Sequence, residues 1–277
     1  MTRADWATLL TDAAGLREHG CFIAEGRLVL QRVLDSLGAG QIVEALATPA
    51  AVRALGLDEL IGDRLVTRTP AEMAGLTGFN FHRGVLALVR RLPVSGPRQL
   101  IADAGGGARS EEGGAGAARP RRLIVVAEHL ADVDNVGSCF RNARAFGAVA
   151  VLLDDRCPDP LYRKAVRTSL GAVLDVPWTS APMPALLDAL AECDVHTIGL
   201  TPHSATEAGC PVGPLSTVCA VIPPAARVAI VVGNEGAGLS GETMARCTSL
   251  ARIPMAGDAD SVNVATALAV ALYELRR

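Results

Sequence analysis

The chain has 277 residues, of which 50% are hydrophobic and 20% are charged, a composition typical of a folded protein with a large core. Its 26 Lys and Arg residues against 29 Asp and Glu residues give a net charge of -3, so any binding of nucleic acid has to come from a local basic patch. No run approaches the roughly 20 apolar residues of a membrane helix, and the N-terminus lacks a signal-peptide pattern. We therefore expect a cytoplasmic protein.

The cysteines and histidines do not form a metal or disulfide pattern. The seven cysteines are widely spaced, without a C-x-x-C pair, and the five histidines show neither H-E-x-x-H nor any other clustered ligand spacing. We expect no disulfide framework and no metal.

The first part of the chain, residues 1–95, is expected to form a small α/β domain. An amphipathic helix is predicted over residues 27–37, and short strands are predicted over 21–24, 42–47, 64–67 and 85–89. The spacing of the helix places five side chains inward: Leu28, Val29, Val33, Leu34 and Leu37. Residues 96–120 are rich in Gly, Ala and Ser, which predicts a flexible linker.

The last part, residues 121–277, alternates continuous apolar runs with helical patterns. Strands are predicted over 123–126, 149–153, 195–200 and 228–232. Helices are predicted over 136–146, 161–169, 183–192, 239–247 and 262–275. This alternation indicates an α/β domain whose mostly parallel sheet has helices on both faces. The last helix is so apolar that we expect it to pack in the core or against a second subunit.

Ligands of such sheets bind beyond the carboxyl ends of the strands, so the loops there are the candidate site. The loop at 233–239 contains three glycines in the order G-x-x-G-x-G, which matches neither a dinucleotide fingerprint nor a Walker loop. This glycine pattern is equally compatible with a tight turn and with a binding loop.

Two further segments carry polar groups at strand ends. After the first strand, Asn135 is followed six residues later by Arg141, and Arg144 lies on the same helix. These residues indicate either a capped helix with solvated arginines or an anion site at the helix N-terminus. In the segment 253–264, Ser261 is a candidate helix cap, whereas Asn263 is a polar group in an apolar helix that needs a partner.

These three segments, in this order, resemble the motifs of the SpoU/TrmH family of the SPOUT superfamily, the knotted RNA ribose 2′-O-methyltransferases. The resemblance covers residues 121–277, with the motifs Asn135-x-Gly137-x-x-x-Arg141, Gly233-x-Glu235-Gly236-x-Gly238 and Ile253-Pro254-Met255 through Ser261-x-Asn263. The first domain resembles, over shorter stretches at 22–26 and 78–84, the ribosomal-protein-like substrate-binding domain of the family.

The resemblance implies a trefoil-knotted methyltransferase domain that binds S-adenosylmethionine, acts on RNA and forms a homodimer. It implies cofactor binding by Leu200, Thr201, Gly233, Asn234, Gly236, Gly238, Ile253, Met255 and Val262. It implies catalytic roles for Arg141, Asn135, Glu235, Ser261 and Asn263. Val262 stands where the family more often has leucine.

Two alternative roles are considered for Arg141. As the catalytic arginine it either abstracts the 2′-hydroxyl proton or stays charged and stabilises the developing alkoxide, because a free guanidinium is protonated at ordinary pH.

The substrate is expected to be RNA. The segment 141–167 has an excess of three positive charges despite the acidic total, and we expect RNA contacts from Arg144, Arg163, Lys164, Arg167, His82 and Arg83. Ribosomal RNA is the first candidate and transfer RNA the second. A non-catalytic RNA-binding or ribosome-assembly protein is a further alternative, whereas a nucleotide-dependent oxidoreductase is disfavoured by the lack of G-x-G-x-x-G after the first strand.

Overall fold

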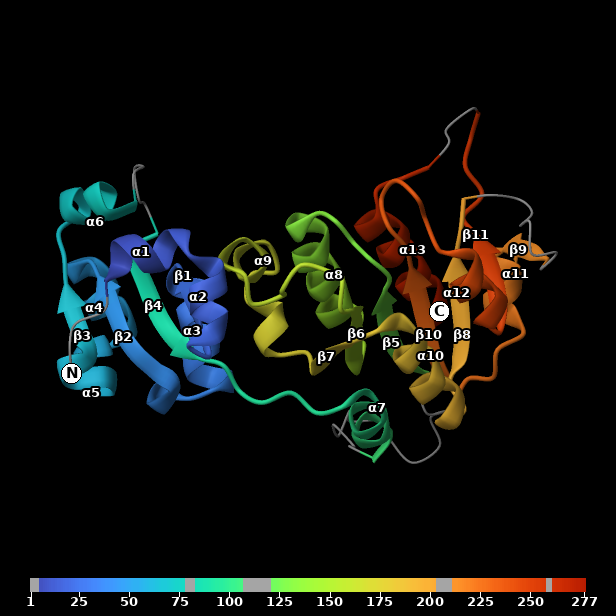
Figure 1. Ribbon diagram of the computed structural model, residues 1–277, viewed down its shortest axis with the longest axis horizontal. Helices are drawn as coiled ribbons and strands as arrows, with labels where there is room; N and C mark the ends of the chain where they lie inside the picture. The colour runs from blue at the N-terminus through green and yellow to red at the C-terminus, as the bar shows by residue number, and fades with distance from the viewer. Residues whose placement is uncertain (1–4, 78–82, 107–120, 203–210, 258–260) are drawn as a thin grey trace. The chain divides into compact units, whose positions relative to one another are not determined.

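The computed structural model describes residues 5–77, 83–106, 121–202, 211–257 and 261–277. It divides into two compact units. Unit 1 contains residues 1–93 and 159–175, and unit 2 contains residues 94–158 and 176–277. Figure 1 labels the helices and strands of both units and colours them by their order along the chain.

Unit 1 is built on one four-stranded sheet in the order β1-β4-β2-β3. β2 and β3 pair in parallel, and the other neighbours are antiparallel. Its strands are β1 (Cys21–Glu25), β2 (Ile42–Ala47), β3 (Leu65–Thr67) and β4 (Val85–Arg90). Its helices are α1 (Trp6–Thr11), α2 (Ala13–Glu18), α3 (Arg27–Ser36), α4 (Pro49–Leu55), α5 (Leu57–Ile61), α6 (Pro70–Thr77) and α9 (Arg163–Thr168). The four predicted strands and the predicted helix α3 are confirmed.

Two side chains of α3 differ from the prediction. Val29 and Val33 are buried as expected, but Leu28 is 53% exposed, and Leu30 is buried instead. The buried face of the helix therefore includes Leu30 in place of Leu28.

Unit 2 contains a seven-stranded sheet in the order β7-β6-β5-β10-β8-β11-β9. All of its strand pairs are parallel, which confirms the predicted parallel sheet. Its strands are β5 (Arg122–Ala127), β6 (Ala150–Asp154), β7 (Trp178–Ala181), β8 (His196–Leu200), β9 (Val212–Pro214), β10 (Arg227–Val232) and β11 (Ser249–Arg252). Its helices are α7 (Pro97–Gly106), α8 (Val133–Ala145), α10 (Met183–Glu192), α11 (Leu215–Ala220), α12 (Gly241–Arg246) and α13 (Val264–Arg276).

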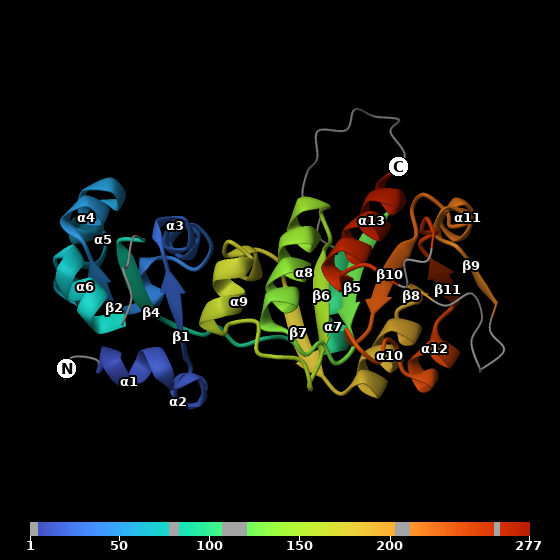
Figure 2. The ribbon, with the colours of Figure 1, turned by 90° about the horizontal axis from the view of Figure 1, so that it is seen from above.

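Helices cover both faces of this sheet, which explains why its central strands are apolar throughout. Ile101 of α7 and Leu186 of α10 pack with Ile124 and Val126 of β5 in one core cluster. Figure 2 shows α8 and α13 side by side, on the opposite side of the sheet from α10 and α12. Among the helices that the structure describes, none has the length and apolarity needed to cross a bilayer.

The expected linker is wrong over its first part. Residues 97–106 form α7, which begins with Pro97 at its first position and buries Leu100 and Ile101 in the core of unit 2. The glycine-rich composition hid this helix because the apolar pair lies just before the glycine run. The remainder of the expected linker, residues 107–120, lies outside the described residues.

The expected boundary of the second domain also differs. The segment 159–175 belongs to unit 1, where α9 packs against β1. Arg91 pairs with Asp159 at 2.5 Å, and Asp175 pairs with Arg32 at 3.3 Å and accepts a hydrogen bond from Ser36 at 2.7 Å. These ion pairs join residues that are far apart in sequence, so they attach the segment to unit 1.

Candidate functional site

The carboxyl ends of three neighbouring strands of unit 2 meet at one edge of the sheet. β8 lies between β10 and β11, and Leu200 is in register with Ala251. The Thr201 amide donates a hydrogen bond to the Ala251 carbonyl at 3.0 Å. Gly233 follows β10 directly, and Ile253 follows β11 directly. The four positions predicted to bind a ligand at strand ends therefore share one edge.

The loop after β10 is a tight, closed turn. The Asn234 amide donates to the Gly238 carbonyl at 3.0 Å, and the Gly238 amide donates back to the Asn234 carbonyl at 2.8 Å. The Asn234 side-chain oxygen accepts from the Gly236 and Ala237 amides, both at 2.9 Å. A Cβ on Gly233 would overlap the Gly238 carbonyl group, so only glycine fits there. The turn holds its own shape and presents Glu235.

Glu235 accepts three hydrogen bonds from the segment that starts α8. The Ala131 amide donates to its Oε2 at 2.9 Å, and the Asp132 amide donates to Oε1 at 3.0 Å. The Asn135 side chain donates to Oε1 at 2.8 Å. Burial opposes ionisation of Glu235, but these hydrogen bonds outweigh it and hold the pKa of the carboxyl below its ordinary value.

Asn135 extends this contact to the last helix. It is buried, and its Oδ1 accepts a hydrogen bond from Asn263 Nδ2 at 3.0 Å. Asn263 is the N-cap of α13, and its own Oδ1 accepts from the Ala265 amide at 2.9 Å. The partner expected for Asn263 is therefore Asn135. The chain Glu235, Asn135, Asn263 joins one residue from each of the three sequence motifs.

Arg141 lies on a different side of α8 from this network. Asn135 and Asn142, seven residues apart, both face α13, and Asn142 donates to the Ala265 carbonyl at 2.7 Å. Arg141 is about 100° around the helix from Asn142, so the six-residue spacing does not place it beside Asn135. Its side chain is exposed and forms no hydrogen bond or ion pair with the part of the chain that is described. Its guanidinium is available to a ligand.

The remaining site positions of unit 2 differ in exposure. Ser261 and Val262 are exposed and precede α13, so Asn263 and not Ser261 caps that helix. Ile253 and Met255 are half-buried, and Thr201 is buried.

The residues expected to contact RNA fall in both units. Arg144 is exposed on α8 of unit 2, whereas Arg163, Lys164 and Arg167 lie on α9 of unit 1. Arg83 also belongs to unit 1. His82 lies outside the described residues.

Glu128 was missed by the sequence reasoning. It is buried at the end of β5 and accepts hydrogen bonds from the Ser240 amide at 3.0 Å, the Ser240 hydroxyl at 2.7 Å and the Thr243 hydroxyl at 2.8 Å. It therefore holds the start of α12, which follows the glycine turn. A charged residue directly after an apolar strand was the available signal.

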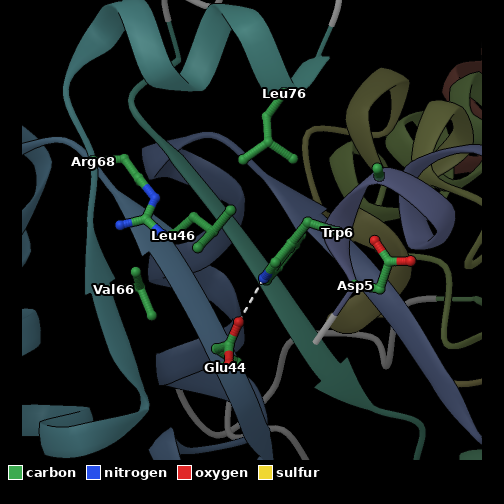
Figure 3. Close-up of a pocket in the computed structure, with 8 residues that line it drawn as sticks. Asp5, Trp6, Glu44, Leu46, Val66, Arg68 and Leu76 are labelled. Atoms are coloured by element: carbon green, nitrogen blue, oxygen red, sulfur yellow. Dashed lines mark hydrogen bonds between the residues drawn. The ribbon is translucent and has the colours of Figure 1, made fainter. Parts of the chain in front are cut away.

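A hollow of about 220 Å³ in unit 1 was also missed. Figure 3 shows the Trp6 indole pointing at Glu44, with Arg68 and Leu76 among the other lining residues. Trp6 Nε1 donates to Glu44 Oε1 at 2.5 Å. This contact ties α1 to the sheet. Within the described ranges, no group of three or more His, Cys, Asp or Glu residues is arranged to hold a metal ion.

The fold defines an α/β protein with a candidate ligand site at the carboxyl ends of the strands of a parallel sheet, and comparison with known proteins identifies its family. The model of the SpoU rRNA Methylase family matches residues 122–273. A protein of Mycobacterium bovis, named as an uncharacterized tRNA/rRNA methyltransferase, is 36% identical over 260 residues, which cover 92% of this chain and 80% of the relative. The chain belongs to the SpoU rRNA methylase family and is an RNA methyltransferase.

Solved structures agree with this assignment. An rRNA methyltransferase from Sinorhizobium meliloti with bound AdoMet has a TM-score of 0.76 at 23% identity, covering 98% of this chain and 92% of that chain. An RNA 2′-O ribose methyltransferase has a TM-score of 0.70 at 26% identity, covering 98% of this chain and 93% of that chain. The fold of this chain is that of the SpoU methyltransferases.

Proposed function

We propose that the chain transfers a methyl group from S-adenosylmethionine to a ribose 2′-hydroxyl of RNA, with ribosomal RNA as the first candidate substrate and transfer RNA as the second. The observation that carries this proposal is the hydrogen-bonded chain Glu235, Asn135, Asn263. It draws the glycine turn and the starts of α8 and α13 together at the edge where parallel sheets bind ligands. The likeness to an RNA 2′-O ribose methyltransferase at 26% identity supports ribose as the target.

SpoU methyltransferases use S-adenosylmethionine, and the residues at the sheet edge fit its nucleoside. They offer backbone groups and uncharged side chains, and the absence of a side chain at Gly233 lets two backbone segments approach closely. We assign cofactor binding to Leu200, Thr201, Gly233, Asn234, Gly236, Gly238, Ile253, Met255 and Val262. When bound, the cofactor supplies an electrophilic methyl group on a sulfonium.

In the proposed reaction the ribose 2′-oxygen forms a bond to the methyl carbon while the carbon–sulfur bond breaks and its electron pair stays on sulfur. The hydroxyl proton leaves in the same process. Arg141 either accepts that proton or, as a fixed charge, stabilises the developing alkoxide while the proton passes to solvent water. Glu235, Asn135 and Asn263 hold the surrounding loops, and the exposed Ser261, two residues before Asn263, has a hydroxyl that can meet the substrate.

The test is transfer of labelled methyl groups to separated ribosomal and transfer RNA from cells that lack this gene. We expect label on ribose, and we expect Arg141→Ala to lose about 100-fold or more in rate. Arg98→Ala, at an exposed arginine of α7, is the matched control and keeps the wild-type rate. Absence of label on both RNAs, or an Arg141→Ala rate equal to wild type, would contradict the proposal.

The two roles of Arg141 differ in their pH profiles. If Arg141 is a fixed charge, Arg141→Lys keeps the charge and lowers the rate without changing the shape of the profile. If Arg141 is the base, the lysine variant moves the pH at which the rate levels off, because the proton acceptor has changed.

The family resemblance also leads us to propose a trefoil knot in unit 2, a homodimer and a cytoplasmic location. Light scattering after size exclusion tests the dimer, which is expected at twice the chain mass of 28.6 kDa.

A further inference from the structure

A hollow in unit 1 gathers arginines from three separate segments. It has a volume of about 230 Å³ and lies where β1 ends and α3 begins. Arg27 comes from α3, Arg83 precedes β4, and Arg167 comes from α9, and all three line the hollow together with Glu25. The site therefore depends on the segment 159–175 being part of unit 1.

Glu25 is a buried carboxylate whose negative charge is balanced by arginines. Its side chain is 1% exposed, and neither oxygen accepts a hydrogen bond from the described part of the chain. Arg83 Nε lies 3.3 Å from its Oε1, and Arg163 Nε lies 3.8 Å from its Oε2. A buried charge is costly unless it is paired, so Glu25 holds both guanidiniums at this place. Each guanidinium has five N–H donors, more than its contact with Glu25 uses.

The start of α3 adds further donors for an anion. Its N-cap is Gly26, with a φ of 93° and no side-chain cap hydrogen bond. The first amides of a helix lack partners within the helix and attract negative charge. Gly26, Arg27 and Val29 line the hollow. Three arginines line the hollow, and Arg163 pairs with Glu25 beside it, so positive charges outnumber the one carboxylate and the ligand that fits is an anion.

Two exposed leucines add apolar surface to the hollow. Leu28 is 53% exposed and Leu170 is 37% exposed, and both line the hollow. A nucleotide unit of RNA has both features that this lining would bind: a phosphate for the arginines and a sugar or base that can pack against the exposed leucines.

We propose that this hollow binds a backbone phosphate of the substrate RNA and that Glu25 is a positioning residue for Arg83 and Arg163. The proposal rests on the proposed RNA methyltransferase function. It brings Arg83 and Arg167, which were expected to contact RNA, into one defined site and assigns roles to Glu25, Gly26 and Arg27.

The experiment measures binding of deproteinised ribosomal RNA to the full-length protein, without S-adenosylmethionine, over a range of salt concentrations. Each lost phosphate contact lowers the slope of log affinity against log salt by about 0.7 to 0.9. We expect this change for Arg27→Gln and for Arg167→Gln. The matched control is Arg53→Gln, an exposed arginine of α4 outside the hollow, with an unchanged slope.

Glu25→Gln separates positioning from charge. Removal of a negative charge tightens RNA binding if the arginines act by charge alone, whereas we expect binding about tenfold weaker because two guanidiniums lose their fixed positions. Thermal unfolding identifies any variant that fails to fold, and the Arg27 and Arg167 variants then decide the outcome. Equal salt slopes for Arg167→Gln, Arg27→Gln and Arg53→Gln overturn the proposal.

Two further outcomes are distinguishable. Inorganic phosphate that binds the hollow without competing with RNA would assign the site to a small phosphorylated ligand and overturn the RNA proposal. Methyl transfer by the wild-type protein, together with unchanged RNA binding by the hollow variants, would refute this inference and leave the proposed function intact. RNA binding that is weakened in the hollow variants, together with no methyl transfer by the wild-type protein, would support this inference and contradict the proposed function.

Discussion

Glu235→Gln tests whether the contact between the glycine turn and α8 depends on a charged carboxylate. Glutamine keeps one acceptor oxygen for the Asp132 amide and the Asn135 side chain, but its NH2 group meets the Ala131 amide, which is also a donor. Hydrogen bonds to charged groups contribute about 1.5 to 3 kcal/mol each. Because Glu235 is exposed and screened by solvent, we reduce the expected loss to about 1 to 2 kcal/mol. This corresponds to a Tm lower by about 2 to 8 °C.

The pH dependence of this loss follows from the lowered pKa of Glu235. A carboxyl whose pKa is lower in the folded state stabilises the protein above its unfolded pKa, and the stabilisation disappears as the pH falls through the folded value. The difference in Tm between wild type and Glu235→Gln is therefore largest at pH 7, and it narrows as the pH falls below 4.5, the ordinary pKa of a glutamate.

Scanning calorimetry of both proteins between pH 7 and pH 3.5 measures this difference, and methyl transfer is assayed in parallel. Glu242→Gln, at an exposed glutamate of α12, is the matched control for activity and keeps the wild-type rate. A Tm difference that stays constant or grows as the pH falls would refute the reasoning.

Three further outcomes are expected. Gly233→Ala places a Cβ against the backbone of Gly238, so we expect cofactor affinity by calorimetry to fall about tenfold or more, while Gly241→Ala, with no atom within 4 Å of its Cβ, keeps it. Arg121→Ala removes donors to the last carbonyls of both α11 and α13 and lowers the unfolding free energy measured in urea by about 1.5 to 3 kcal/mol; no change in midpoint would contradict this. Burial raises the pKa of the Cys157 thiol to about 12, so mass spectrometry is expected to find it unalkylated by iodoacetamide at pH 8 until the protein is unfolded.

The strands that sequence analysis predicted well are those with continuous apolar runs. β5, β6, β8 and β10 lie in the middle of the sheet of unit 2, with helices on both faces, so burial leaves a clear pattern in their sequences. β7 and β9 were not predicted. They are the edge strands and are short, and β9 consists of Val212, Gly213 and Pro214, so its pairing with β11 depends on the tertiary structure.

The candidate site could likewise be predicted only in part, because its contacts depend on tertiary packing. The need of Asn263 for a partner was visible as a polar residue in an apolar helix, but the identity of that partner depended on how α8 and α13 pack. The side of α8 that Arg141 occupies is likewise fixed by which residues face α13. The role of Glu25 was hidden because its arginine partners lie 58 and 138 positions further along the chain.

The chain passes between its two units three times, after residues 93, 158 and 175. A fragment that starts at residue 94 would retain α9 without β1, the strand on which it packs. Ala165 and Val166, which are fully buried in the intact chain, would then lose their covering. Catalytic fragments of this protein are therefore expected to aggregate unless residues 159–175 are replaced by a polar connection, and the boundary for expression cannot be chosen from the family match alone.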